Sequence, residues 1–349
     1  MKILYAIQGT GNGHISRARD IIPLLQKKGE VSILVSGIQA DMELPFKVDY
    51  RFKGLSFIFG KNGGVDLVST YLKMDINTLL KDIEQVPIEN YDLIINDFEP
   101  ITAWACKQKK LACISLSHQC AVLSKHSPKP KKKNPLGRSV LKYYAPTTKQ
   151  YGFHFSKFDE NIFTPVIRKE IRELTPTKNK HYTVYLPAYD DERLFKNLLQ
   201  LKGVEWQVFS KHNKNTIKRN NVTIQPIENN AFINSLATCT GVLCGAGFET
   251  PAEALFLNKK LLVIPMKTQY EQHCNAAALK EMGIKVIKSL KKKNHGDIKK
   301  WIDYGKVVPV NYPDITEQII DLIIKGHQHS TNKYISTLKF NKPLLAANF

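Results

Sequence analysis

The chain of 349 residues lacks the patterns of a membrane-spanning, exported or disulfide-rich protein. It has no apolar run near the roughly 20 residues that a membrane-spanning helix needs. Its apolar N-terminal run is short and breaks at Gln8-Gly9 without a small-residue cleavage pattern, which argues against a signal peptide. The six cysteines form no CxxC pair, so zinc or dithiol redox chemistry has no spacing to support it. We therefore expect a cytoplasmic protein with buried free thiols.

Acidic residues are scarce beside basic ones, 31 against 51, which gives a formal net charge of +20. Such a charge implies attraction to nucleic acid, an anionic membrane or phosphorylated substrates. The lysines concentrate in Lys125–Lys149 and in Lys288–Lys293. No nucleic-acid reader module is recognisable, so we expect no nucleic-acid partner. We interpret Lys125–Lys149 either as a solvated loop or as a surface that docks on an anionic membrane, which would place the protein at the inner face of that membrane.

Short apolar runs alternate with helical stretches along both halves of the chain, which is typical of βαβ units and a parallel sheet. The pattern predicts strands at residues 3–7, 31–35, 91–96, 112–116, 182–186, 206–209, 222–225, 241–243, 260–264 and 285–287. It predicts helices at residues 16–28, 65–85, 101–109, 191–201, 230–238, 251–257, 272–282 and 296–304. We expect an α/β protein with two domains, residues 1–175 and 176–325, followed by a tail at 326–349 that packs back on the N-terminal domain.

Two segments interrupt this pattern. Pro23 lies inside the first predicted helix and should kink or shorten it. Residues 124–148 contain four prolines and many lysines. This composition predicts a long mobile loop, and such loops in compact domains are usually functional lids or disordered.

The first strand leads into a glycine-rich turn that ends in a histidine, Gly9-Thr10-Gly11-Asn12-Gly13-His14. Glycines let a backbone approach a ligand closely, and the helix that follows offers unpaired N–H groups to an anion. Histidine is the side chain best suited to proton transfer near neutral pH. A dinucleotide fingerprint would need glycine in place of His14 and an acidic residue after the second strand, where Ser36-Gly37 stands instead. We favour a ligand-binding loop over a purely structural turn in which His14 caps or packs.

A second strand–turn–helix pattern contains Gly245-Ala246-Gly247. Thr250, Pro251 and Glu253 have the spacing of a capping box, with Thr250 as N-cap and the acid three residues later. Alternatively, the glycines admit a diphosphate to the helix N-terminus while Glu249 or Glu253 binds ribose hydroxyls.

A polar stretch follows the strand that ends near Pro265. Its side chains Glu271, Gln272 and Asn275 can hydrogen-bond a polyhydroxylated ligand. An exposed helix N-terminus with ordinary polar residues is the alternative.

Together these segments resemble the GT-B nucleotide-sugar glycosyltransferases. The closest resemblance is to the group that includes the lipid-linked N-acetylglucosamine transferase of peptidoglycan synthesis and the UDP-glycosyltransferases. It extends over residues 1 to about 325. It implies two Rossmann-like domains that face a central cleft, a UDP-sugar donor and an acceptor hydroxyl, for which a lipid-linked or cell-envelope glycan is one candidate. Asn12 interrupts the usual glycine pair before the histidine, and the plant-type His-Cys-Gly-Trp element is absent, so sugar and acceptor stay open.

The resemblance also implies site residues. The acceptor and phosphate side would comprise the N-terminal loop, namely Gly9, Thr10, Gly11 and Gly13 with His14. Apart from the resemblance, Arg17 is a basic side chain that could help to stabilise the leaving diphosphate. His118 and Gln119 follow the strand at 112–116, and the rule that ligands lie at the carboxyl ends of parallel strands puts them on the acceptor side. The donor side would comprise the second glycine turn, its helix, the backbone that reads the base and the polar stretch, namely Ile227, Gly245, Ala246, Gly247, Phe248, Glu253, Glu271, Gln272 and Asn275, to which the residue pattern alone adds Glu249. A lone histidine at a strand end, such as His118, is otherwise more often structural.

For the mechanism we expect inverting transfer with His14 as general base. Asp97 either orients His14 or serves as the base itself, and a helix cap before Pro100 is an equal alternative for it. No Asp-x-Asp motif occurs, so we expect neither a metal nor a cofactor. Three rival interpretations remain at this point: a nucleotide-sugar 2-epimerase of the same fold, a basic nucleic-acid-binding protein, and a sugar-binding module without activity.

Overall fold

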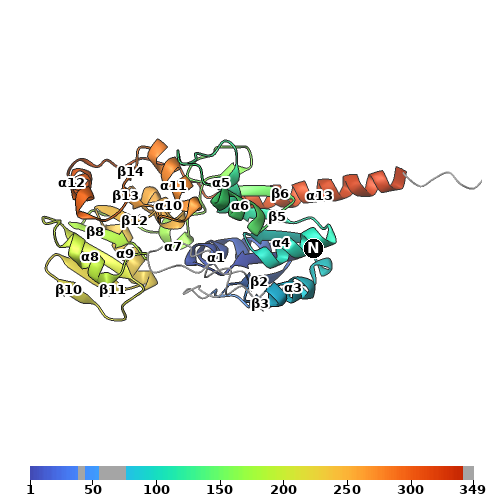
Figure 1. The fold of residues 1–349 in the computed structure, drawn as a ribbon. Coiled ribbons are helices and arrows are strands. Elements are labelled where there is room, and N and C mark those ends of the chain that lie inside the picture. Colours follow the sequence, from blue (N-terminus) through green and yellow to red (C-terminus); the bar gives the residue numbers. More distant parts are fainter. Residues whose placement is uncertain (38–43, 55–75, 341–349) are drawn as a thin grey trace, which may run out of the picture.

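The computed structural model describes residues 1–37, 44–54 and 76–340. Each half of the chain builds one seven-stranded sheet with helices packed around it. Figure 1 shows the two sheets side by side, the first half in blue to green and the second in yellow to orange. This architecture confirms the predicted α/β class with two parallel-sheet units.

The first sheet is entirely parallel, in the order β3-β2-β1-β4-β5-β6-β7. Its strands are β1 (Lys2–Gln8), β2 (Glu30–Ser36), β3 (Tyr50–Phe52), β4 (Leu93–Asp97), β5 (Ile114–Ser117), β6 (Lys149–Phe153) and β7 (Ile162–Phe163). β1 is covered on both faces, which explains its continuous apolar run. The strand order reverses between β1 and β4, so their carboxyl ends open a crevice where ligands bind in such sheets.

Helices surround this sheet. They are α1 (Asn12–Gln26), α3 (Ile76–Gln85), the 3₁₀ turn η1 (Ile88–Asn90), α4 (Pro100–Lys109), α5 (His118–Leu123), α6 (Pro135–Tyr144) and α7 (Lys169–Arg172). The apolar face of α1 packs Ile15, Ala18 and Ile22 into the same core as Tyr5 of β1. This packing fixes the start of α1 directly beyond the end of β1.

The second sheet has the order β10-β11-β9-β8-β12-β13-β14 and is parallel except for the β10–β11 pair. Its strands are β8 (His181–Tyr185), β9 (Glu205–Ser210), β10 (Ile217–Arg219), β11 (Val222–Pro226), β12 (Gly241–Gly245), β13 (Lys260–Ile264) and β14 (Lys285–Val286). Its helices are α8 (Asp191–Leu198), α9 (Asn229–Thr238), α10 (Glu249–Phe256), α11 (Tyr270–Glu281), η2 (Lys292–Asn294) and α12 (His295–Tyr304). The order reverses between β8 and β12, as it does between β1 and β4.

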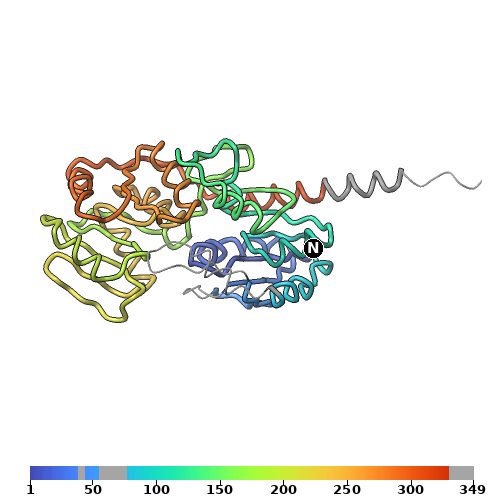
Figure 2. The backbone as a smooth tube through the Cα atoms, in the orientation of Figure 1, coloured from blue at the N-terminus to red at the C-terminus, as the bar shows by residue number. Residues whose placement is uncertain are grey.

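The helix α13 (Thr316–Phe340) returns to the first sheet, and Figure 2 follows the chain along this path. Lys28 at the end of α1 pairs with Glu317 at 3.1 Å and with Asp321 at 2.8 Å. α13 begins at Thr316, ten residues before the predicted start of the tail at residue 326. The predicted domain boundaries at residues 175 and 325 stay predictions. No helix in the described residues is both long and apolar enough to span a bilayer.

Two local predictions can be compared with the structure. α1 continues through Pro23 and ends at Gln26, two residues before the predicted end at residue 28, and burial of Ile21, Ile22 and Leu25 stabilises its last turn despite the missing N–H. Residues 124–148 are not one long loop, since they contain α6. That helix begins where the Asn134 side chain accepts a hydrogen bond from the Gly137 N–H at 2.9 Å. Residues 65–75 of the helix predicted at 65–85 lie outside the described residues.

Candidate functional site

A cavity of about 1350 Å³ lies between the two halves of the chain. Its walls are the loops beyond the carboxyl ends of β1, β4 and β5 in the first sheet, and of β8, β9, β11, β12 and β13 in the second. Both sheets therefore direct their strand ends toward one space. A cleft of this size at paired strand ends is a typical ligand site of α/β proteins.

The N-terminal glycine loop forms one side of the cavity. Gly11 has φ 90° and serves as the N-cap of α1 without a side-chain hydrogen bond to the first turn. The first N–H groups of α1 thus face the cavity without a side-chain cap. Gly9 does not line the cavity, because it packs on β2, where an added Cβ would lie 2.9 Å from Val35 Cγ1. Gly9 therefore supports the turn from behind.

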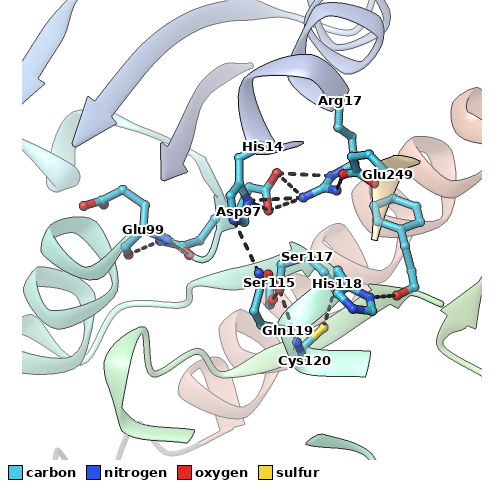
Figure 3. Close-up of polar contacts among 12 residues, drawn as sticks. His14, Arg17, Asp97, Glu99, Ser115, Ser117, His118, Gln119, Cys120 and Glu249 are labelled. Carbon is cyan, nitrogen blue, oxygen red and sulfur yellow. Dashed lines mark hydrogen bonds and ion pairs between the residues drawn. The ribbon is translucent and has the colours of Figure 1, made fainter. Parts of the chain in front are cut away.

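His14 and Asp97 meet at the β1–β4 crevice, as Figure 3 shows. His14 Nδ1 lies 2.8 Å from Asp97 Oδ1. Burial raises the pKa of Asp97, but Arg17 and His14 outweigh it and the net pKa is lowered, so Asp97 is a carboxylate. The Nδ1–H of His14 therefore donates to Asp97, which leaves the Nε2 lone pair as the acceptor. A histidine oriented in this way can accept a proton at Nε2.

Asp97 does not cap the next helix. The N-cap of α4 is Glu99, whose carboxylate accepts hydrogen bonds from the Ile101 and Thr102 N–H groups, both at 2.7 Å. Between the two acids, Phe98 has φ 58°, in the left-handed region that non-glycine residues rarely adopt. The turn at Phe98 separates the carboxylate that contacts His14 from the one that caps the helix. The cap interpretation of Asp97 was therefore wrong.

Arg17 joins the two halves of the cavity. Its Nη2 lies 2.8 Å from both carboxylate oxygens of Asp97, and its Nη1 donates to Glu249 at the start of α10. The guanidinium thus contacts a carboxylate from each half of the chain. The predicted phosphate-side role of Arg17 stays a prediction. Burial raises the pKa of Glu249 to about 7, although Arg17 and His14 act in the opposite direction. Gly13 allows this contact, since its Cβ would lie 3.3 Å from Glu249 Cγ.

His118 connects the two sheets through a buried chain of contacts. Its Nδ1 lies 2.8 Å from the Phe153 carbonyl oxygen, and its Nε2 lies 2.7 Å from Asn275 Oδ1. Its ring stacks on Phe248 with centroids 3.9 Å apart. Asn275 is fully buried, donates to the Ala246 carbonyl at 3.1 Å, and lies behind the cavity wall together with Ala246. These residues hold the halves together, and their predicted ligand contacts stay predictions.

Gln119 lies beside His14 in the cavity. Its Nε2 donates to Glu271 Oε2 at 3.1 Å and lies 3.4 Å from His14 Nε2. Gln272 also lines the cavity, and its Oε1 accepts from the Met266 N–H at 2.9 Å. The polar stretch after β13 therefore reaches the same space as His14.

The second glycine turn leaves open space. A Cβ at Gly247 would meet no atom within 4 Å, and one at Gly245 would meet only Gln272 Oε1 at 3.8 Å. The following helix α10 begins at Glu249 after Phe248, with no side-chain cap. The space above this helix start can accommodate a ligand with negative charge. Ile227, directly after β11, lines the same half of the cavity.

Glu253 is not the acid of a capping box. Its carboxylate accepts from Arg168 Nε at 2.5 Å and from Arg168 Nη2 at 3.0 Å. Arg168 is buried, precedes α7 and also pairs with Glu170. The helix begins at Glu249 without a side-chain cap, so the interpretation of Thr250, Pro251 and Glu253 as a capping box was wrong.

Sequence reasoning missed several residues that line the cavity, among them Gln8, Phe98 and Arg168. Gln8 ends β1, so the rule that ligands lie at the carboxyl ends of parallel strands could have found it. Arg168 lies in an irregular segment, and no sequence pattern marks it. Among the described residues, no three His, Cys, Asp or Glu side chains gather as metal ligands would. The expectation that transfer needs no metal stays an expectation.

Two mostly parallel sheets that open onto one cavity, with glycine turns on both sides and a histidine–carboxylate pair on one, define a GT-B glycosyltransferase. A family model described as Glycosyl transferase family 1 matches residues 1–304. The chain therefore belongs to glycosyl transferase family 1, and it is an enzyme of the hexosyltransferase type. A search of curated protein sequences gave no match for this chain.

Solved structures share the fold at low sequence identity. Acinetobacter baumannii MurG is 13% identical with a TM-score of 0.53 over 93% of this chain and 99% of that chain. Arabidopsis thaliana UGT89C1, solved with quercetin, is 11% identical with a TM-score of 0.57 over 94% and 93%. Phytolacca americana UGT2, solved with UDP-2fluoro-glucose and pterostilbene, is 12% identical with a TM-score of 0.56 over 97% and 98%. At these identities the likeness concerns the fold.

Proposed function

We propose that this enzyme transfers a sugar from a UDP-sugar to an acceptor hydroxyl with inversion at the anomeric carbon. The observation that carries the proposal is the His14–Asp97 pair, at 2.8 Å, beside a cavity whose other half has an open glycine turn and an uncapped helix start. Structures of the same fold were solved with UDP and with UDP-2fluoro-glucose, which favours a uridine nucleotide here.

His14 is the proposed general base. Its Nε2 takes the proton of the acceptor hydroxyl while that oxygen forms a bond to the anomeric carbon. The bond from this carbon to the diphosphate oxygen breaks, and its electron pair leaves with the nucleoside diphosphate. Asp97 is a positioning residue, because it holds the Nδ1–H tautomer and stabilises the imidazolium that forms.

Direct displacement agrees with the carboxylates that line the described cavity. Glu249 pairs with Arg17, Glu253 with Arg168, and Glu271 accepts from Gln119. Each of these acids is therefore engaged, and none is a free nucleophile for a covalent sugar intermediate. On the donor side, N–H groups at the start of α10 would stabilise the negative charge that develops on the leaving diphosphate.

The experiment compares wild type with His14→Ala and His14→Gln. Calorimetry with UDP should give dissociation constants within about threefold of each other, since His14 is not on the donor side. Turnover of UDP-sugars with an acceptor panel should fall by about 10²–10⁴-fold in both variants, the usual contribution of a general base. Turnover within a few-fold of wild type would exclude His14 as the base. Turnover that needs no acceptor and changes the donor sugar itself would favour a 2-epimerase instead.

We further propose that the acceptor half docks on an anionic membrane surface. Helix α6 exposes 59% of Leu136 and 54% of Tyr143, next to the exposed Lys131–Lys133. Its Val140 and Leu141 line the cavity, so the same helix adjoins both surfaces. Such a position suits a lipid-linked acceptor that reaches the cavity from the membrane.

The lysine clusters provide a matched pair of variants for this second proposal. Replacing Lys131–Lys133 by serine should weaken co-sedimentation with phosphatidylglycerol vesicles by about 10²-fold, at about 1 kcal/mol for each lysine near the surface. The same replacement at Lys291–Lys293 removes equal charge elsewhere on the chain and should change binding little. Equal losses in the two variants would show that only net charge matters and would contradict a docking surface at α6.

A further inference from the structure

Three buried oxygen atoms in the first half of the cavity have no hydrogen-bond partner in the described part of the chain. They are Gln8 Oε1, Thr10 Oγ1 and Gln119 Oε1, and all three residues line the cavity. Gln8 is 3% exposed and Gln119 is 5% exposed. Buried polar atoms in folded proteins normally have a partner, and leaving one unpaired is costly. A ligand that donates hydrogen bonds at these three places would supply the missing partners.

The Gln8 amide is held by a row of aromatic rings. Its Nε2 donates to the Tyr144 hydroxyl at 2.8 Å, which leaves Oε1 as the atom without a partner. The Tyr144 ring stacks on Phe98 with centroids 4.8 Å apart. The Phe98 ring is nearly parallel to that of His14, at 6.4 Å between centroids and 10° between planes. Gln8 and His14 therefore contact opposite ends of this row.

The Gln119 amide lies at the His14 end of the row. Its Nε2 is shared between Glu271 Oε2 at 3.1 Å and His14 Nε2 at 3.4 Å. The unpartnered Oε1 is the other arm of that amide. Gln119 Oε1 thus belongs to an amide adjacent to the proposed base, His14, and Gln8 Oε1 lies at the other end of the row, beyond Phe98.

From this arrangement, and resting on the proposed transfer function, we propose that Gln8 determines acceptor specificity by accepting a hydrogen bond from a second hydroxyl of the acceptor. The acceptor is accordingly a carbohydrate or another polyhydroxylated ring. One hydroxyl faces His14, the apolar face of the ring lies along Phe98, and a further hydroxyl donates to Gln8 Oε1. An acceptor with a single hydroxyl would leave this oxygen unpaired, and a site built for a hydrogen bond rejects such a ligand.

The test uses two acceptors with the same ring size, methyl β-glucopyranoside and cyclohexylmethanol, and UDP-glucose and UDP-N-acetylglucosamine as donors. Wild type should transfer to the glucoside with a kcat/KM at least about tenfold above that for the single-hydroxyl alcohol, in line with the loss of one hydrogen bond to a buried group. Gln8→Met, which keeps the length of the side chain without the amide, should lower kcat/KM for the glucoside about tenfold. It should leave the value for cyclohexylmethanol and the KM for the donor unchanged.

Two further variants serve as controls. Gln8→Glu keeps an acceptor oxygen and should retain the preference for the glucoside. Thr102→Val removes another buried hydroxyl, one that lies on α4 outside the cavity, and should leave the preference unchanged.

The inference is overturned if Gln8→Met changes both acceptors equally, or if wild type prefers the alcohol. It is also overturned if wild type binds UDP yet transfers to neither acceptor, and this outcome leaves the proposed donor site intact. Failure of the wild-type chain to bind UDP is a different result, because it contradicts the proposed function itself.

Discussion

Glu249 should make the stability of this enzyme fall as pH rises from 4.5 to about 7. The residue follows the open glycine turn, contacts Arg17 across the cavity, and exposes only 20% of its side chain. Burial raises its pKa from 4.5 to about 7. A carboxyl with a raised pKa binds its proton more tightly in the folded chain than in the unfolded one, so its ionisation favours unfolding. The penalty is absent below pH 4.5, grows between pH 4.5 and 7, and is complete above pH 7.

The size of this effect follows from about 1.4 kcal/mol for each pKa unit. At pH 8 the ionised Glu249 lowers the free energy of unfolding by about 3 kcal/mol, and at pH 5.5 by about 1 kcal/mol. Glu249→Gln removes the titration and keeps the shape of the side chain. Between pH 5.5 and 8, wild type should therefore lose about 2 kcal/mol relative to the variant.

The assay is urea unfolding of both proteins at several pH values, followed by tryptophan fluorescence and circular dichroism. The attraction of Arg17 to the ionised carboxylate is already contained in the net pKa shift of Glu249, so the difference in slope between the two proteins is the diagnostic quantity. Titrating groups that do not interact with Glu249 are common to both proteins and cancel. Parallel stability curves from pH 5.5 to 8 would refute the reasoning, and so would a variant that loses stability faster than wild type.

Two further substitutions test the buried ion pairs on either side of the cavity. Asp97→Asn should lower kcat by about 10²–10⁴-fold, because the amide no longer fixes the His14 tautomer, and should change the dissociation constant for UDP little. Turnover of this variant near the wild-type value would show that Asp97 does not position the base. Arg168→Met leaves Glu253 buried without its partner and should lower the free energy of unfolding by about 3–5 kcal/mol. The double variant with Glu253→Met as well should regain most of this loss. Equal urea midpoints for the single and the double variant would contradict this account.

The features that the sequence predicted correctly depend on short-range patterns. The strand, glycine turn and helix around His14 lie within one stretch of chain, and their apolar spacing and turn residues are sufficient to place them. The same holds for the turn at Gly245. The fold class follows from repeating this unit, because alternating strands and helices form parallel sheets. Two sheets with aligned strand ends then bring both turns to one cavity.

The features that the sequence did not predict depend on contacts between distant residues. Glu253 has the spacing of a capping acid, yet its carboxylate accepts hydrogen bonds from Arg168. No local sequence pattern predicts a contact between residues 85 positions apart. Asp97 and Glu99 are two acids at one strand end, and the left-handed turn at Phe98 decides which of them caps α4. In α6 the start signal of Asn134 and Pro135 was present, but the surrounding lysines and prolines favoured a loop.

The distribution of charge explains why one arginine can matter to both halves of the reaction. The proposed base and its carboxylate partner belong to the first sheet, whereas the open turn for the donor belongs to the second. Arg17 contacts Asp97 on one side and Glu249 on the other. It therefore links the partner of the proposed base to the start of α10, where the diphosphate would bind. A diphosphate bound at that helix start would repel an ionised Glu249 and favour its protonated form. Binding of the donor would then leave Arg17 to Asp97 alone, which would partly neutralise the carboxylate that holds His14 in its base tautomer.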